Sequence, residues 1–167
     1  TLPDIDLTNL QACKALILQQ QAYIQQLEQE RNLFDAGPVL TITWDPVNRG
    51  AIQHVSPNVA DILGYSKAEM TSPHFIYDDI IHPEDREQQR GESQKNKEMG
   101  LDHYNQHYRL KAKTGEYRWF YDQTQCIRDM QGKVVGYKGY LMDETPLLES
   151  QRALAEERQR LANIIEG

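Results

Sequence analysis

Apolar residues recur with a helical period in the first segment of the chain. Residues 8–36 contain no Gly or Pro and are rich in Gln, Glu, Leu and Ala, which favour helix formation. In a coiled coil, the residues that contact the partner helix (the seam) recur every seven residues at one position, and at a second position three residues later. The two sets are Leu10, Ile17 and Ile24, and Cys13, Gln20, Leu27 and Phe34. Two interpretations stay open, because the helix either forms a dimer seam through Leu10, Ile17, Ile24 and Leu27 or packs as an amphipathic helix on its own domain.

A similar helical pattern is present over residues 147–166. Leu147, Leu154 and Leu161 are seven residues apart, whereas the second seam position is occupied by Ser150, Glu157 and Ile164. One apolar residue per heptad is too few to hold a coiled coil alone, so we expect this helix to need the rest of a larger protein. Two helices that bracket a globular middle suggest a rod that transmits a signal rather than a catalytic fold.

The middle of the chain, residues 38–145, shows the shorter period of β-strands. Two strands joined by a turn precede several short helices, and three strands joined by tight turns follow them. The expected strands are Val39–Asp45, Ala51–Val55, Tyr104–Lys113, Tyr117–Arg128 and Val134–Met142. Helix starts are expected at Ser56-Pro57, at a capping box from Ser66 to Glu69, and at His82-Pro83. The pattern predicts an α+β fold, with a five-stranded antiparallel sheet and short helices inserted between strands two and three.

Charge and composition exclude several classes of protein. The 167 residues carry a formal net charge of -7, and Lys and Arg form no dense cluster for nucleic-acid phosphates. No apolar run approaches the ~20 residues that span a bilayer, and no signal peptide is expected. Cys13 and Cys126 are far apart, which indicates reduced thiols. We therefore expect a cytoplasmic chain with neither nucleic acid nor direct membrane contact.

Candidate catalytic and metal-binding groups have simpler structural explanations. The acidic pairs at Asp78-Asp79 and Glu84-Asp85 are interpreted as a solvated connector and a helix start, because a glycosidase-like site needs carboxylates that converge on a cleft. The sequence shows no nucleophile elbow, Gly-rich phosphate loop or Cys/His cluster. His103 and His107 lie on an expected strand, where their spacing is about 13 Å, so they are interpreted as surface or hydrogen-bonded side chains. We therefore predict no catalysis by this chain and no metal site.

Five local patterns, taken together, resemble one family of sensory domains. They are Val55-Ser56-Pro57-Asn58-Val59 with Ile62-Leu63-Gly64-Tyr65, Ile81-His82-Pro83-Glu84-Asp85-Arg86, Tyr108-Arg109-Leu110 with Thr114-Gly115-Glu116-Tyr117-Arg118-Trp119, Arg128-Asp129-Met130-Gln131-Gly132 with Val135-Gly136-Tyr137-Lys138-Gly139, and Asp143-Glu144-Thr145. Each string alone is weak, but five in this order over about 105 residues are specific. The chain resembles a PAS domain with its C-terminal PAC half, of the kind found in tandem ahead of diguanylate cyclase or histidine kinase modules.

The resemblance implies a role for each part of the chain. It implies an N-terminal amphipathic or coiled-coil helix over residues 1–37, a PAS/PAC sensor domain over 38–145 and an output linker helix over 146–167. The implied partners are a second copy of the chain, in a homodimer, and an output domain downstream in the same protein. The parent protein would then be a diguanylate cyclase or a sensor histidine kinase.

The triplet that ends the last strand resembles the Asp-x-Thr linker motif of this family. Asp143 and Thr145 are the expected signal-coupling residues. We expect the Thr145 hydroxyl to cap the output helix, with Pro146 at its first position. Asp143 would hold the strand end through an Arg or a backbone amide, which the sequence does not identify.

Cofactors common in this family are not predicted. Flavin-binding members carry an Asn-Cys-Arg motif, whereas residues 71–75 contain no Cys. Many haem-binding members use a His in the long helix, and none occurs between Pro83 and Gly100. A haem held by His74 or His82, in a gas or redox sensor, is kept as a less favoured alternative. The remaining alternatives are an unknown small organic ligand, or a ligand-free module for dimerisation and interaction.

Candidate pocket residues follow from strand alternation, because neighbouring side chains point to opposite faces of a sheet. The sequence alone allows either face. If Gly115 and Gly132 occupy the turns that they occupy in related domains, one set of strand side chains points toward the interior of the domain. This set is Ile42, Trp44, Tyr108, Leu110, Phe120, Asp122, Thr124, Tyr137 and Leu141. It is interpreted as pocket or simply as core, except that a carboxylate at Asp122 needs a polar ligand, a water-filled cavity or a different register.

Overall fold

The structure, a computed structural model, describes residues 7–48 and 50–166. The chain divides into two units, the first ending at Ala36 and the second beginning at Gly37. The first unit contains the long helix α1 (Leu7–Asp35). Its expected seam residues Leu10, Ile17, Ile24 and Leu27 are 42 to 53% exposed, and the side chain of Phe34 lies outside the described residues. None of the described helices combines the length and the apolar character needed to cross a membrane.

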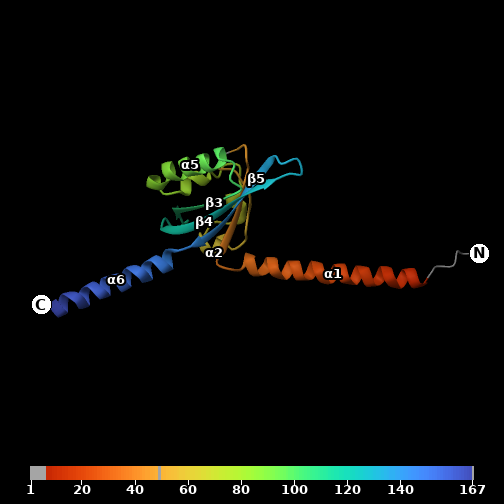
Figure 1. The fold of residues 1–167 in the computed structure, drawn as a ribbon, viewed down its shortest axis with the longest axis horizontal. Helices are drawn as coiled ribbons and strands as arrows, with labels where there is room; N and C mark the ends of the chain where they lie inside the picture. Colours follow the sequence, from red (N-terminus) through yellow and green to blue (C-terminus); the bar gives the residue numbers. More distant parts are fainter. Residues whose placement is uncertain (1–6, 49, 167) are drawn as a thin grey trace, which may run out of the picture. The chain divides into compact units, whose positions relative to one another are not determined.

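The second unit is built on a five-stranded antiparallel sheet, which confirms the predicted α+β fold. Its strands are β1 (Val39–Trp44), β2 (Ile52–Val55), β3 (His103–Lys111), β4 (Tyr117–Arg128) and β5 (Val134–Asp143). Figure 1 labels β3, β4 and β5 of this sheet. The strand order is β2-β1-β5-β4-β3. The first hairpin therefore pairs with the last strand, and the register brings Trp44 opposite Tyr137.

Four helices connect β2 to β3. They are α2 (Val59–Ile62), α3 (Lys67–Met70), α4 (Tyr77–Ile80) and α5 (Pro83–Glu98). The capping box at Ser66 is confirmed, because its hydroxyl accepts a hydrogen bond from the Glu69 amide while the Glu69 carboxylate accepts one from the Ser66 amide. The expected start of α5 is also confirmed, since Pro83 follows the N-cap residue His82.

The start of α2 differs from the expectation. The helix begins at Val59, with Asn58 as its N-cap residue, so the predicted cap at Ser56 is wrong. The Ser56 hydroxyl instead accepts a hydrogen bond from the Thr41 amide at 2.8 Å and donates one to Asn58 Oδ1 at 2.6 Å. Ser56 therefore ties the end of β2 to β1, because the pairing of these strands brings the Thr41 amide within reach.

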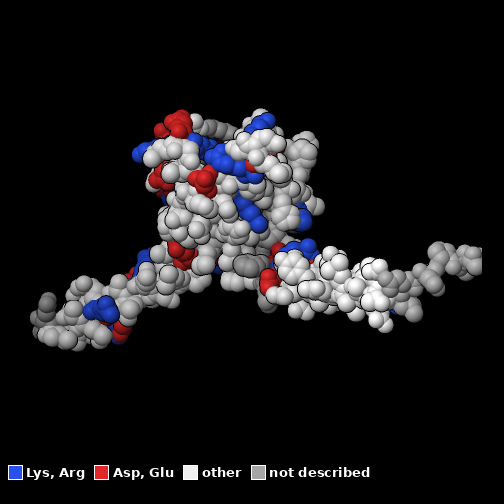
Figure 2. Space-filling view, turned by 45° about the vertical axis from the view of Figure 1, so that its right-hand side comes forward, with Lys and Arg blue, Asp and Glu red and all other residues white. Residues whose placement is uncertain are grey.

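The core lies between the inner face of the sheet and the short helices. Its largest fully buried apolar side chains are Tyr108, Phe120, Leu40, Ile42, Leu63, Met70, Ile81, Leu110, Leu141, Val55 and Val59. Asp85 attaches α5 to β3, because its carboxylate accepts hydrogen bonds from the amide and guanidinium of Arg109 at 2.8 to 2.9 Å. The Arg109 guanidinium holds the pKa of the Asp85 carboxyl below its usual range. Figure 2 shows charges of both signs interspersed over the visible face of this unit.

Candidate ligand cavity and output junction

A cavity of about 270 Å³ lies between the inner face of the sheet and the helices α4 and α5. This volume is close to the lower end of the range for small-molecule sites. The sheet contributes Trp44, Tyr104, Gln106, Asp122, Thr124 and Tyr137 to its wall. The helices contribute Tyr77, Asp78, Gln89, Arg90, Ser93 and Lys97. Neither His74 nor His82 is among the wall residues of this cavity.

The carboxylate of Asp122 is the centre of a buried hydrogen-bond chain. Only 2% of the residue surface is exposed. The Tyr108 hydroxyl donates to Asp122 Oδ2 at 2.7 Å, and the Thr124 hydroxyl donates to Oδ1 at 3.1 Å. The Tyr77 hydroxyl lies 2.9 Å from that of Tyr108, which extends the chain to α4. Each oxygen of Asp122 thus accepts a hydrogen bond from a hydroxyl group, and the residue borders the cavity from the inner face of the sheet, as expected.

Burial changes the acid–base behaviour of this chain. Loss of solvent raises the pKa of Asp122 to about 6, although the hydrogen bonds from Tyr108 and Thr124 act in the opposite direction. Burial and the nearby Asp122 carboxylate hold the pKa of Tyr77 and Tyr108 well above the usual value. Both tyrosines therefore stay neutral hydrogen-bond donors while Asp122 titrates.

We expect Asp122→Asn to change how stability depends on pH. Native Asp122 binds its proton more tightly than the unfolded chain, so the stability from this proton is present below about pH 4 and lost as the pH rises through about 6. The variant cannot ionise and avoids this loss. Its unfolding free energy relative to wild type should rise by about 2–3 kcal/mol from about pH 4 to about pH 7. Urea denaturation across this range measures the difference, and parallel curves for the two proteins would contradict it.

Gly139 allows two cavity groups to approach the strand β5. A Cβ atom at this position would lie 2.5 Å from Cη2 of Trp44 and 2.8 Å from Oδ1 of Asp122. The Trp44 ring packs edge-on against Tyr77 with 5.3 Å between ring centroids, and its buried Nε1 has no hydrogen-bond partner among the described residues. Gly139 was not among the expected site residues, although a Gly inside a strand is a signal of close approach.

The nine expected pocket residues all lie on the inner face but fall into two groups. Trp44, Asp122, Thr124 and Tyr137 line the cavity. The other five are fully buried core residues that do not line it, namely Ile42, Tyr108, Leu110, Phe120 and Leu141. Tyr108 still acts on the cavity indirectly, because it donates to Asp122.

Sequence reasoning missed the helical wall of the cavity. Gln89, Ser93 and Lys97 are four residues apart on α5, which places them on one helix face toward the sheet. Gln106 on β3 is only 3% exposed, accepts a hydrogen bond from the Ser93 hydroxyl and donates to the Gln89 carbonyl. The available sequence signal for a polar cavity was the four-residue spacing of Gln89, Ser93 and Lys97, together with a Gln at position 106 on the same strand face as Tyr108.

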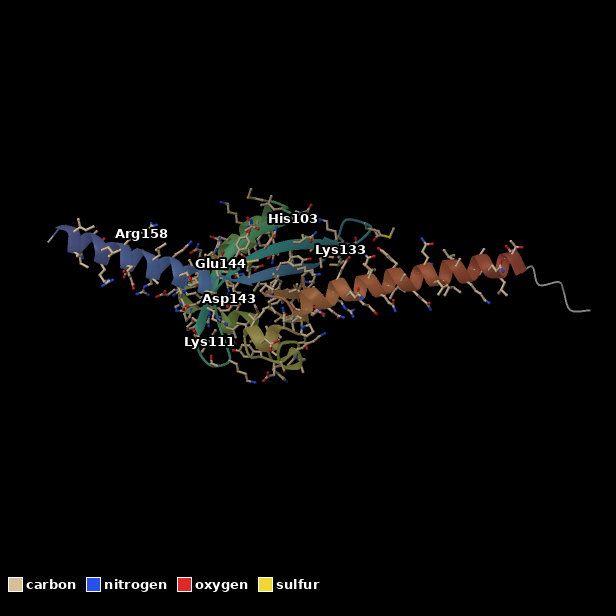
Figure 3. All side chains as sticks on the ribbon, turned by 90° about the horizontal axis from the view of Figure 1, so that it is seen from below. His103, Lys111, Lys133, Asp143, Glu144 and Arg158 are labelled. Carbon is tan, nitrogen blue, oxygen red and sulfur yellow. The ribbon has the colours of Figure 1, made fainter. Side chains whose placement is uncertain are left out.

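A second constellation joins the sheet to α6 (Thr145–Glu166), which follows β5 directly. Figure 3 shows Asp143 and Glu144 where α6 leaves the sheet. Asp143 Oδ1 accepts a hydrogen bond from the Thr145 amide at 2.9 Å, and its Oδ2 lies 2.9 Å from Nε of Arg118 on β4. That Nε makes no aligned hydrogen bond, so the contact is an ion pair. Asp143 thus fixes the first residue of α6 to the neighbouring strand.

The structure corrects the role expected for Thr145. Its hydroxyl accepts a hydrogen bond from the Trp119 amide on β4 at 2.8 Å instead of capping the helix. α6 begins at Thr145, so Pro146 is its second residue. The Glu144 amide donates to the Trp119 carbonyl at 2.8 Å, and the Glu144 carboxylate lies 3.0 Å from Nδ1 of His107. The helix start is therefore attached to β3 and β4, because β4 lies between β3 and β5.

Comparison with known proteins agrees with this architecture. The PAS-fold family matches residues 52–141, which is more than half of the chain. A methyl sulfide methyltransferase-associated sensor of Methanosarcina acetivorans is 32% identical over 137 residues, covering 82% of this chain but only 14% of that protein.

Two solved structures share the fold. A sensory box histidine kinase/response regulator from Burkholderia thailandensis is 25% identical, with a TM-score of 0.60 over 81% of this chain and 98% of that chain. The N-terminal domain of a diguanylate cyclase with PAS/PAC sensor from Marinobacter aquaeolei is 23% identical, with a TM-score of 0.56 over 64% of this chain and 95% of that chain. From the matched family, the strand order and the inserted helices, the chain belongs to the PAS-fold family of sensory domains.

Proposed function

We propose that this PAS domain senses a small ligand in its cavity and transmits the bound state through α6 to an output module. The strand β4 contributes residues to both the cavity and the start of α6. β4 contributes Asp122 to the cavity wall, and three and four residues earlier it contributes Trp119 and Arg118 to the contacts at the start of α6. A shift of β4 caused by a ligand at Asp122 would therefore act directly on the contacts of Asp143 and Thr145.

In the proposed mechanism, β4 and the start of α6 adopt two alternative arrangements relative to each other. The ligand need only favour one arrangement of β4 and α6 over the other to shift their populations. Coupling energies between sites are commonly about 1–3 kcal/mol, which is within reach of the few hydrogen bonds and the ion pair at this junction. The catalytic step itself would belong to the output module.

The type of output module is proposed by analogy. Domains of this fold occur in a diguanylate cyclase with PAS/PAC sensor and in a sensory box histidine kinase. We propose an output domain of one of these types, downstream of α6 in the same protein. The domain boundaries proposed are 1–37 for the N-terminal helix, 38–145 for the sensor and 146–167 for the linker helix.

Native mass spectrometry of the freshly purified chain tests the sensing proposal. We expect a small organic molecule that leaves under denaturing conditions, because the volume of the cavity is close to that of small-molecule sites. Asp61→Asn, an exposed change on α2, serves as a control that should retain the molecule. A protein that never carries or binds any small molecule would instead support a ligand-free interaction module.

The alternative function as a dimerisation module is favoured by the exposed seam on α1. Leu10, Ile17, Ile24 and Leu27 recur at heptad positions and are solvent-exposed in the single chain. We propose that this seam pairs two copies of the chain in either case, so the two functions differ in the ligand and share the dimer.

Replacing Ile17 and Ile24 by Glu should convert a dimer into a monomer. The change would bury unpaired charge in the apolar seam, which costs several kcal/mol per ion. Multi-angle light scattering measures the mass. Gln19→Glu and Gln26→Glu together add the same charge off the seam and should leave the dimer intact. A double seam variant that scatters as wild type does would rule out this interface.

A further inference from the structure

The cavity wall contains one buried carboxylate, Asp122, and no cation among the described residues neutralises it. Both oxygens of Asp122 accept hydrogen bonds from hydroxyl groups, and no Lys or Arg in the described part of the chain forms an ion pair with it. Each carboxylate oxygen has two lone pairs, so the group can accept further hydrogen bonds beyond those from Tyr108 and Thr124. A buried carboxylate without a positive partner is costly, and a cation in the adjacent cavity would offset this cost.

Aromatic rings surround the same space. Trp44, Tyr77, Tyr104 and Tyr137 all line the cavity. Faces of such rings attract organic cations, most strongly when water is excluded. The Tyr137 ring already contacts one cation, because the ammonium group of Lys97 lies 4.3 Å from its centroid. The rings and the carboxylate are therefore two separate features that favour the same kind of ligand.

The positive groups of the wall lie on α5, opposite the sheet. Arg90 is bound to Asp78 of α4, with 2.6 Å between Nη2 and Oδ2. Lys97 lies over Tyr137. Arg90 is therefore engaged by Asp78 and Lys97 by the Tyr137 ring, and neither cation forms an ion pair with Asp122. A ligand with a cationic end would therefore place that end toward Asp122.

We propose that the cavity binds a small organic cation, an alkylammonium compound whose head group contacts the Asp122 carboxylate and the surrounding rings. The proposal rests on the proposed function, since it names the chemistry of the ligand that this domain senses. The volume of about 270 Å³ limits the ligand to a compact molecule.

Binding of such a cation should depend on pH. Only the ionised carboxylate attracts the head group, and burial raises the pKa of Asp122 to about 6. Affinity should therefore be about tenfold weaker at about pH 5 than at about pH 7.5. Burial raises the pKa of Tyr104 to about 12, and Tyr77 and Tyr108 are also shifted upward, so these groups remain neutral throughout. The other titratable or charged wall residues are Asp45, Asp78, Arg90, Lys97 and Tyr137.

The experiment compares cations with neutral molecules of the same shape. Calorimetric titration of the chain uses choline against dimethylbutanol, its carbon isostere, and propylamine against propanol. At about pH 7.5 at least one cation should bind about tenfold more tightly than its neutral partner, a difference of about 1.4 kcal/mol. Asp122→Asn should abolish this preference, whereas Asp61→Asn, exposed on α2, should retain it.

The pH profile of the wild-type chain gives a readout that does not depend on the folding of a variant. If neutral partners bind as well as the cations, or if cation binding is equal at the two pH values, the cationic ligand class is wrong. Sensing of some other small molecule would still stand if native mass spectrometry finds one bound. If no molecule binds in either experiment, both the ligand class and the sensing function fail.

Discussion

Gly139→Ala is expected to give one of the largest stability losses of any single-methyl change in this domain. The new Cβ would lie 2.5 and 2.6 Å from two carbons of the Trp44 ring and 2.8 Å from Asp122 Oδ1, distances that real Cβ atoms do not show. The Trp44 ring packs edge-on against Tyr77, so a displacement of the Trp44 ring would disturb the cavity wall. Overpacking of this kind costs about 1–3 kcal/mol, which urea denaturation should detect. Trp44 fluorescence in a Trp119→Phe background should also shift, since the indole must leave its position.

Gly136→Ala provides the matched control on the same strand. Its Cβ would meet neighbours at 3.6 to 3.8 Å, which is ordinary van der Waals contact. Both glycines are buried on β5, so the comparison isolates the collision with Trp44 and Asp122 from any general effect of Ala in a strand. Equal losses in the two variants would show that Gly139 has no special role in admitting the Trp44 ring.

Asp143→Ala in the full-length parent is expected to uncouple the output from the stimulus while the domain stays folded. The variant loses both the hydrogen bond to the Thr145 amide and the ion pair with Arg118. Loss of a helix-start hydrogen bond costs typically about 1 kcal/mol, a small part of the stability of a domain. The same amount is comparable to the whole coupling energy, so the ratio of outputs with and without stimulus should fall toward one. A thermal melt of the isolated domain, run beside the output assay, separates the two effects.

Asp143→Asn tests which contact carries the coupling. Its side-chain oxygen can still accept from the Thr145 amide, but it has no charge to pair with Arg118. A lost response in both variants would assign the coupling to the ion pair with β4. A response retained by Asn but lost by Ala would assign it to the hydrogen bond at the helix start. An unchanged response ratio in Asp143→Ala would reduce the residue to a structural role.

Alternation along the strands was readable from the sequence because it depends only on local geometry. Side chains in a strand alternate between faces, so one inward residue on β3 or β4 determines the others on that strand. Phe120, Asp122 and Thr124 occupy alternate positions of β4 and were expected to point inward together, and all three are buried. The capping box at Ser66 and the helix start at His82 are likewise local, since their partners lie within three residues.

The contacts that define the cavity were decided only by the tertiary structure. Strand order brings β1 beside β5, so Trp44 lies over Gly139, and β4 beside β3, so Asp122 meets Tyr108. These pairs come from distant segments, and periodicity carries no information about which strand lies beside which.

The junction shows the same division between local pattern and tertiary contact. From the sequence, the last strand was expected to end at Met142, and the resemblance to the Asp-x-Thr motif, with Pro146 following, put Asp143 and Thr145 where that strand becomes a helix. The sequence did not identify Arg118 as the partner of Asp143, and it assigned the Thr145 hydroxyl to its own helix. That hydroxyl instead accepts from the Trp119 amide, because the pairing of β4 with β5 brings that backbone donor to the end of β5. Local preference set the helix start, and the packing of β4 decided which groups hold it.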